Sequence, residues 1–247
     1  MKFTEDTLFI APTPIKLAEE LAGWFLTKVF ECSSREKPFH VAISGGSTPI
    51  LFFTQLASNY GKYIDWNRVH FYWVDEKASS KPGNENNYLC AYNNLLSKIA
   101  IPETNIHPIK FENDLARTAK MYSINIQENV PIIDDIPQFD LVILGIGYDG
   151  HTASVFPGQD DLIYSGNYVE VSENPENNEK RITLTPYLIN NAAYIAFHAT
   201  GMAKAQMIKE IVSKSNSENN YPASHIKPIK GSINWFIDTG AASKLFS

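Results

Sequence analysis

The sequence predicts an α/β fold, a layered sandwich in which helices flank a mostly parallel sheet. Short apolar runs typical of buried strands recur along the chain, and longer stretches with helical spacing of apolar residues separate them. Strands that alternate with helices of this length pair in parallel, because each crossover helix returns the chain to the same end of the sheet. No internal repeat interrupts this pattern, so we expect a single domain over residues 1–247.

The expected strands are short and almost continuously apolar, which is typical of strands buried on both faces of a parallel sheet. They cover residues 40–43, 69–74, 141–144, 182–184, 194–197 and 235–237.

The first expected helix begins at Pro14 with Thr13 as its cap. Proline is favoured at the first helical position and threonine directly before it. Its apolar residues form one stripe, made of Leu17, Leu21, Trp24, Phe25 and Val29. Helical spacing predicts further helices over residues 49–60, 86–99, 112–128 and 202–213.

The composition excludes several classes of protein. Hydrophobic residues make up 44% and charged residues 19% of the chain, which is a globular mixture and not a disordered one. The net charge of −6 argues against general binding to nucleic acid or to a membrane surface, since both require a basic face. A local basic pocket for a small anionic molecule remains compatible with this charge.

Nothing in the sequence indicates a membrane or secreted protein. The longest apolar run has six residues, 192–197, whereas a membrane-spanning helix needs about 20. The N-terminus carries acids and prolines where a signal peptide needs a basic start and an apolar stretch. Cys32 and Cys90 are too few for a disulfide scaffold and lack metal-ligand spacing. We therefore expect a reduced, cytoplasmic protein.

Ligands of open α/β sheets bind at the carboxyl ends of the strands, so the loops that follow strands are the places to search. The first such loop reads SGGSTP over residues 44–49. Gly45 and Gly46 allow a sharp turn, and Pro49 fits the first helical position, which makes Thr48 the expected cap. A helix N-terminus of this kind is an anion site, most naturally for phosphate. The alternative is a plain capped turn, and the missing GKS/T ending excludes a P-loop.

Two further loops carry charged residues or histidine. Asp75, Glu76 and Lys77 come directly after a buried strand, where unpaired charges are rare. The alternative is the start of a solvated loop. Residues 145–154 read GIGYDGHTAS, and His151 is the side chain there that titrates near neutral pH. That setting makes His151 a candidate general base, although a lone histidine is more often structural.

The last loop ends in Lys204, expected in the first turn of a helix. Lysine there opposes the helix dipole, which is tolerable if the ammonium meets a phosphate; the alternative is an ordinary surface lysine. Arg181 precedes the strand at 182–184, so in a parallel strand it would lie at the wrong end of the sheet. It reaches the site only if that strand is reversed or the pocket wraps around it. Histidines 40, 70 and 198 lie in or beside strands and are expected to be packed or surface residues.

The segments together resemble the 6-phosphogluconolactonases. They are SGGSTP, VDE, FDLVILGIGYDGHTASVFPG, KRITLTPYLIN, the Gly-Met-Ala-Lys turn and YPASHIKPIKGSINWFIDTGAA, in matching order and spacing from about residue 10 to the C-terminus. The most specific piece is DGHTAS-x-FPG. The resemblance implies the fold of this family, which it shares with glucosamine-6-phosphate deaminases and which is related to that of ribose-5-phosphate isomerases.

The resemblance also implies an activity, the hydrolysis of 6-phospho-D-glucono-1,5-lactone to 6-phosphogluconate in the oxidative pentose phosphate pathway, with no metal or organic cofactor. The expected partner is this small molecule, with no nucleic acid or membrane, and a monomer is favoured. By similarity His151 is the base. Asp75 is expected to orient a sugar hydroxyl or hold a cation, and the Gly45–Gly46 turn to stabilise the oxyanion. The other expected binding residues are Ser47, Thr48, Lys77, Asp149, Arg181 and Lys204.

Two positions distinguish this chain within the resemblance. Lys77 stands where the family usually has arginine, which keeps the charge but loses bidentate phosphate geometry. The deaminases read DGHIAFNEP, with a glutamate where this chain has Phe156, and a phenyl ring cannot transfer a proton. An amino-sugar-phosphate isomerase or deaminase therefore stays as an alternative, as does a non-catalytic sugar-phosphate sensor, against which the retained His151 argues.

Overall fold

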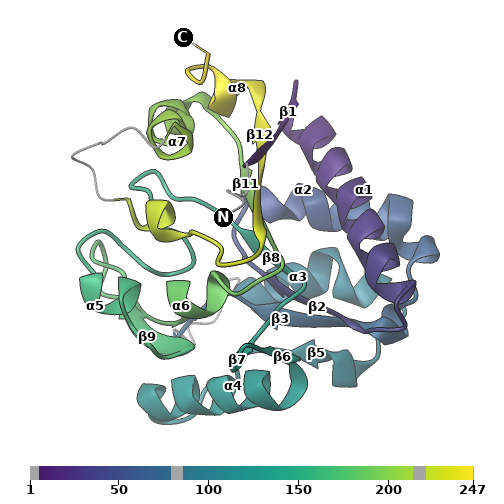
Figure 1. Cartoon of the computed structure of the whole chain (residues 1–247), viewed down its shortest axis with the longest axis vertical. Coiled ribbons are helices and arrows are strands. Elements are labelled where there is room, and N and C mark those ends of the chain that lie inside the picture. The colour runs from purple at the N-terminus through teal and green to yellow at the C-terminus, as the bar shows by residue number, and fades with distance from the viewer. Residues whose placement is uncertain (1–5, 79–85, 214–220, 247) are drawn as a thin grey trace.

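A computed structural model describes residues 6–78, 86–213 and 221–246. Its centre is a seven-stranded sheet in the order β1-β12-β11-β8-β2-β3-β5, in which every neighbouring pair is parallel (Figure 1). The predicted α/β fold with a mostly parallel sheet is therefore confirmed. The strands are β1 (Thr7–Ala11), β2 (Phe39–Ile43), β3 (Val69–Trp73), β5 (Ile106–His107), β8 (Leu141–Leu144), β11 (Tyr194–Ala199) and β12 (Ser232–Asp238).

A second, antiparallel sheet has the order β4-β10-β9. Its strands are β4 (Asp75–Lys77), β10 (Lys180–Leu184) and β9 (Val169–Glu173). A small hairpin pairs β6 (Ile132–Ile133) with β7 (Ile136–Pro137). The apolar pattern predicted β10 but not the other strands of these two units, because they are either very short or carry charged residues.

Helices flank the central sheet, with α1 on one side of β11 and β12 and α7 on the other (Figure 1). The α-helices are α1 (Pro14–Ser33), α2 (Thr48–Gln55), α3 (Asn87–Asn94), α4 (Leu115–Asn129), α5 (Asp160–Ile163), α6 (Pro186–Ile189), α7 (Ala205–Val212) and α8 (Thr239–Ala242). A π-helical turn covers Leu56–Tyr60, and 3₁₀ turns cover Gly61–Tyr63, Trp66–Arg68, Leu96–Lys98, Glu103–Asn105, Met202–Lys204 and Pro222–His225. None of the helices in the described residues is long and apolar enough to span a membrane.

The start of α1 is as the sequence predicts. Pro14 opens the helix, and the Thr13 side chain accepts a hydrogen bond from the Lys16 backbone N–H at 3.2 Å. The buried face of the helix includes Leu17 and Phe25, and the Phe25 ring packs edge-on against a core ring of β2, with 5.4 Å between centroids. Burial of this stripe fixes α1 on the sheet.

The start of α2 differs from the prediction in one respect. Thr48 is the first helical residue and not the cap, because the backbone of Ser47 already has helical dihedral angles. Ser47 occupies the cap position, and its side chain makes no capping hydrogen bond. Pro49 is consequently the second helical residue and not the first, one position later than predicted. The N–H groups at this end of the helix, to which Pro49 contributes none, therefore donate no hydrogen bond to the Ser47 side chain.

The core explains the apolar strands. All residues of β2 and β8 are buried, since helices cover both faces of the sheet. Because β2, β3, β8 and β11 run parallel, the loops that follow them emerge at one edge of the sheet. Most of the functional residues expected from the sequence follow these strands, whereas Arg181 lies in β10 of the second sheet.

Candidate active site

A cavity of about 320 Å³ lies at the carboxyl edge of β2, β3 and β8. Of the ten residues predicted for the site, all except Asp149 line it, and Asp149 is bonded to His151. The lining residues are Ser44, Gly45, Gly46, Ser47, Thr48, Pro49, Asp75, Lys77, Asn87, Gly145, Ile146, Gly147, His151, Ala153, Arg181 and Lys204.

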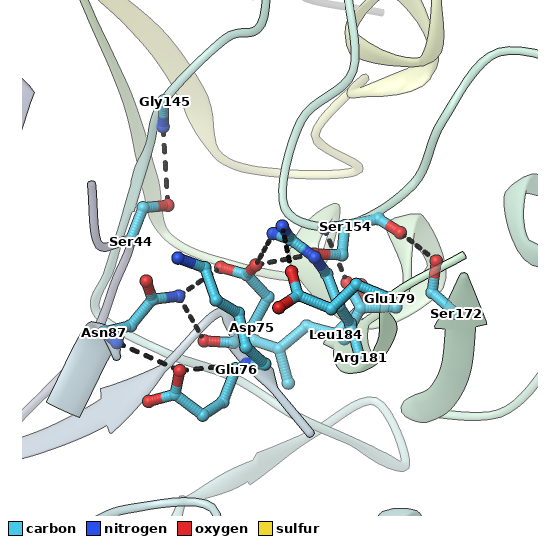
Figure 2. Close-up of polar contacts among 12 residues, drawn as sticks. Ser44, Asp75, Glu76, Asn87, Gly145, Ser154, Ser172, Glu179, Arg181 and Leu184 are labelled. Carbon is cyan, nitrogen blue, oxygen red and sulfur yellow. Dashed lines mark hydrogen bonds and ion pairs between the residues drawn. The ribbon is translucent and has the colours of Figure 1, made fainter. Parts of the chain in front are cut away.

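The turn between β2 and α2 forms one wall of the cavity. Gly46 has a φ of +92°, a conformation that strongly favours glycine. The Ser44 hydroxyl donates a hydrogen bond to the Ile143 carbonyl at 3.0 Å. Its Oγ also accepts a hydrogen bond from the Gly145 backbone N–H, with 3.4 Å between nitrogen and oxygen (Figure 2). Ser44 thereby ties the end of β2 to the end of β8, which holds the two glycine-rich loops side by side.

His151 is held by contacts on several sides. Its Nδ1 lies 2.6 Å from Asp149 Oδ1, and its backbone N–H donates to the same oxygen at 3.1 Å. The Phe156 ring packs against the imidazole with 4.7 Å between centroids, and Phe156 is buried. The imidazole is 31% exposed, so the contact at Nδ1 leaves Nε2 available to a ligand in the cavity.

The interaction with His151 controls the charge of Asp149. Burial by itself would raise the pKa of Asp149, but the hydrogen bonds and the charge that His151 contributes outweigh it and lower the pKa. A carboxylate that stays ionised can keep the Nδ1 proton of the imidazole in place and stabilise the imidazolium.

The reversed direction of β10 answers the question that the sequence left open for Arg181. β10 runs antiparallel to β4 with Arg181 opposite Lys77, so the guanidinium reaches the cavity. Its Nη1 lies 3.6 Å from Asp75 Oδ2, and its Nη2 donates to Glu179 Oε2 at 2.9 Å (Figure 2). Two carboxylates therefore share the charge of Arg181.

Asp75 and Glu76 lie in β4 and are buried, so the alternative of a solvated loop start is wrong. Asp75 accepts hydrogen bonds from the Ser154 hydroxyl at 2.6 Å and from the Asn87 amide at 3.0 Å. Burial raises the pKa of Glu76, opposed by hydrogen bonds from the backbone N–H groups of Asn87, Lys77 and Tyr88. Both carboxylates thus organise the wall of the cavity.

Lys204 lies in the 3₁₀ turn before α7 and is only 8% exposed, so it is not an ordinary surface lysine. Burial lowers the pKa of its ammonium, and attraction to Asp238 opposes that shift. Its Nζ lies 5.3 Å from the centre of the Tyr148 ring. In the described residues no carboxylate lies within ion-pair distance of Lys204, whereas two carboxylates lie beside the guanidinium of Arg181.

The sequence analysis missed Ser44, Asn87 and Ser154. Asn87 lies in the polar stretch NENNY, which indicates only the start of a helix. Its place in the cavity depends on β4, a strand of three residues that carries no apolar signal. Ser44 belongs to the SGGSTP motif that the sequence analysis considered, but the spacing of residues could not predict its hydrogen bonds to the end of β8.

The remaining histidines behave as expected from their positions. His40 and His198 are buried and His70 is partly buried, with His40 and His70 stacked at 4.8 Å between centroids. Within the described residues, no cluster of three or more histidine, cysteine or acidic side chains is placed to hold a metal ion.

Comparisons with known proteins identify the family of the chain. Residues 12–235 match the family described as glucosamine-6-phosphate isomerases/6-phosphogluconolactonase. The chain belongs to this family. A 6-phosphogluconolactonase of Aggregatibacter actinomycetemcomitans is 36% identical over 235 residues, which are 95% of this chain and 97% of that protein.

Solved structures show the same fold. The 6-phosphogluconolactonase of Trypanosoma brucei superposes with a TM-score of 0.88 at 24% identity, over 98% of this chain and 99% of that one. A monomeric glucosamine-6-phosphate deaminase superposes with a TM-score of 0.79 at 18% identity, over 96% of this chain and 99% of that one. The fold is therefore common to lactonases and deaminases, and the side chains of the site must distinguish the two activities.

Proposed function

We propose that this chain is a 6-phosphogluconolactonase, which hydrolyses 6-phospho-D-glucono-1,5-lactone to 6-phosphogluconate. The observation that carries the proposal is that the Asp149–His151 pair shares one cavity with the Gly45–Gly46 turn and with basic side chains. This arrangement supplies a base, a set of oxyanion donors and a phosphate anchor. The family of the chain includes enzymes named for this reaction.

In this mechanism His151 acts as the general base. Its Nε2 removes a proton from water as the water oxygen attacks the C1 carbonyl of the lactone. Asp149 holds the proton on Nδ1 and stabilises the imidazolium that forms, since Asp149 Oδ1 lies 2.6 Å from Nδ1. General base catalysis of this kind typically accelerates a reaction by about 10²–10⁴-fold.

The negative charge that develops on the carbonyl oxygen is placed at the Gly45–Gly46 turn. Backbone N–H groups there would donate to the oxyanion, and each well-placed donor is typically worth about 3 kcal/mol. When the tetrahedral intermediate collapses, the bond between C1 and the ring oxygen breaks. The imidazolium returns its proton to that oxygen, which becomes the hydroxyl of the open-chain product.

The phosphate group of the substrate is assigned to the basic side of the cavity, with Ser47 and Thr48 at the start of α2. Lys204 is the principal cation in this proposal, because two carboxylates already share the charge of Arg181. Lys77 supplies charge without the bidentate geometry of arginine. Holding the phosphate fixes the distance from the anchor to the carbonyl carbon, which is the entropic advantage of binding at two points.

Phe156 supports a lactonase over a deaminase. Its ring lies against His151, in the position where the deaminases carry a glutamate. A phenyl ring neither hydrogen-bonds the imidazole nor transfers a proton. The proton transfers of ring opening and isomerisation therefore lack a partner there, whereas hydrolysis needs only the one base.

The test is lactone hydrolysis measured against the spontaneous reaction, with the wild-type chain and His151→Ala. We expect kcat to fall by about 10²-fold or more while KM changes little, because His151 acts on water rather than on the phosphate. His225→Ala is the matched control, since His225 does not line the cavity, and it should keep wild-type turnover. Near-normal turnover of His151→Ala would remove His151 from the mechanism.

The same assay with gluconolactone lacking the phosphate tests the anchor. Equal kcat/KM for the two lactones would contradict phosphate recognition, even if the lactonase chemistry holds. Release of ammonia from glucosamine 6-phosphate would instead indicate the deaminase activity. Binding of sugar phosphates with no turnover of any of them would indicate a sensor.

A further inference from the structure

The side-chain amide of Asn87 has only one orientation that satisfies its neighbours. Asn87 is the first residue of α3, is 6% exposed and lines the cavity. Its Nδ2 lies 2.8 Å from the backbone oxygen of Asp75 and 3.0 Å from Asp75 Oδ1. Both partners are acceptors, so the atom facing them must be the nitrogen, and both amide hydrogens are used. The other amide atom is therefore the acceptor Oδ1.

Oδ1 lies against the glycine turn. A methyl carbon added to Gly45 would come within 2.1 Å of this oxygen, so the two residues touch only because residue 45 has no side chain. In the part of the chain that the structure describes, no side chain or backbone group donates to Oδ1, and this oxygen is not one of the fully enclosed polar atoms that lack a partner. Because Asn87 lines the cavity, a hydroxyl of a ligand there can donate to this oxygen.

Asn87 is also fixed through its backbone. Its N–H donates to Glu76 Oε1 at 2.9 Å, and the next N–H, of Tyr88, donates to Glu76 Oε2 at 2.8 Å. Glu76 is itself buried in β4 (Figure 2). The peptide and the side chain of Asn87 are thus both held by β4, which makes Oδ1 a preorganised acceptor at the edge of the turn.

We propose that Asn87 is a specificity-determining residue whose Oδ1 accepts a hydrogen bond from the C2 hydroxyl of the lactone. This inference rests on the proposed function, in which the Gly45–Gly46 turn receives the C1 carbonyl oxygen. The carbon next to C1 on one side carries a hydroxyl, and the proposal orients the lactone with that carbon toward Asn87, whose Oδ1 lies against Gly45. The site therefore selects sugar lactones that have a hydroxyl next to the carbonyl.

The test compares 6-phosphogluconolactone with its 2-deoxy analogue, for the wild-type chain, Asn87→Ala and Asn94→Ala. The measured quantity is the ratio of the two kcat/KM values divided by the ratio of the two spontaneous rates, which removes the electronic effect of the C2 hydroxyl. Asn94 is a matched control, because it lies in the same helix and donates to the Cys90 carbonyl, outside the cavity.

We expect the wild-type chain to favour the parent lactone by about 10-fold or more, because the 2-deoxy analogue leaves Asn87 Oδ1 without its hydrogen-bond donor. Asn87→Ala should lose this preference to within about threefold, and Asn94→Ala should keep it. A merely structural effect of Asn87→Ala would lower both kcat/KM values together and leave the ratio unchanged.

Three outcomes overturn the proposal. A wild-type ratio no greater than the spontaneous one does so even if Asn87→Ala fails to fold. An Asn87→Ala ratio equal to that of the wild-type chain does so as well. If the wild-type chain hydrolyses neither lactone, the proposed function fails and the role of Asn87 falls with it, whereas the first two outcomes leave the lactonase activity standing.

Discussion

At the residue scale, Gly147 determines where the imidazole of His151 can lie. A methyl carbon added at Gly147 would come within 2.2 Å of His151 Nδ1 and 2.6 Å of Asp149 Oδ1. We therefore expect Gly147→Ala to push the imidazole away from Asp149 and to lower kcat by about 10-fold to 100-fold, the typical cost of a displacement near 1 Å. The measurement is kcat for lactone hydrolysis, with the melting temperature as the check on folding.

Gly145→Ala is the control for this prediction. It lies in the same loop and lines the same cavity, but a methyl carbon there meets nothing within 4 Å. Its kcat should stay within about threefold of wild type, because no reacting group has to move. If both alanine variants lost activity equally, the effect would belong to loop flexibility, and the fit between Gly147 and His151 would not explain it.

Several of the residues that the sequence predicted for the site share one property. His151, Lys204 and the glycine turn each follow a strand of the parallel sheet, so a rule about strand ends was enough to find them. The rule could not find Asn87, and it gave no role to Ser154, which lies in the loop after β8. Both side chains donate to Asp75 of the second sheet, and such contacts between distant segments leave no periodic signal in the sequence.

At the element scale, β4 and β10 bring a buried ion pair to the edge of the cavity. The Asp75 and Arg181 side chains are 7% and 14% exposed, so removing the cation leaves a buried carboxylate without its counter-charge. We expect Arg181→Met to lower the free energy of unfolding by about 2 kcal/mol, less than the 3–5 kcal/mol typical of a broken buried pair. The loss is smaller because Ser154 and Asn87 still donate to Asp75.

Urea unfolding measures this prediction, and Lys180→Met is the matched control. Lys180 is the neighbouring residue of β10, and its ion pair with Glu173 is exposed. Exposed pairs contribute at most about 1 kcal/mol, so the control should unfold close to the wild-type midpoint. Equal destabilisation of the two variants would show that the loss comes from strand pairing and not from the buried charge.

The elements themselves were predictable where burial dominates. β2, β3, β8, β11 and β12 are apolar because both faces of the central sheet are covered, and each was predicted to within a few residues. β4 and β9 contain charged residues, so their sequences do not resemble the apolar buried strands. The sequence also could not show that β10 is reversed, since direction depends on its partners.

At the scale of the whole molecule, the two ends of the sheet have different chemistry. The carboxyl edge carries the cavity with its basic side chains. Toward the other end, His40 on β2, His70 on β3 and His107 on β5 stack side by side, with 4.8 Å and 5.5 Å between successive ring centroids. This row lies outside the candidate site, so its titration should affect folding and not catalysis directly.

Burial keeps these histidines neutral in the folded chain. It lowers the pKa of His40 to about 3, with the charges of His70 and His107 as lesser causes, and it also lowers the pKa of His70. Burial lowers the pKa of His107 to about 4 as well, and the charges of His70 and Lys110 add to the effect. In the unfolded chain each histidine takes up a proton near pH 6.5.

The folded state is therefore expected to lose stability in acid. The stabilisation is complete above about pH 6.5 and falls as the pH drops toward the folded pKa values, by about 1.4 kcal/mol per pH unit for each proton that only the unfolded chain binds. The raised pKa values of Asp140 and Glu76, caused chiefly by burial, oppose this trend at the acid end.

Urea midpoints at pH 7.5, 6.5 and 5.5 measure how steeply the free energy of unfolding changes with pH. His107→Gln should reduce this slope by about half a proton at pH 6.5 and by nearly one at pH 5.5, because one depressed titration is removed. A midpoint that stayed constant from pH 7.5 to 5.5, or an unchanged slope in His107→Gln, would contradict the assignment of this pH dependence to the histidine row.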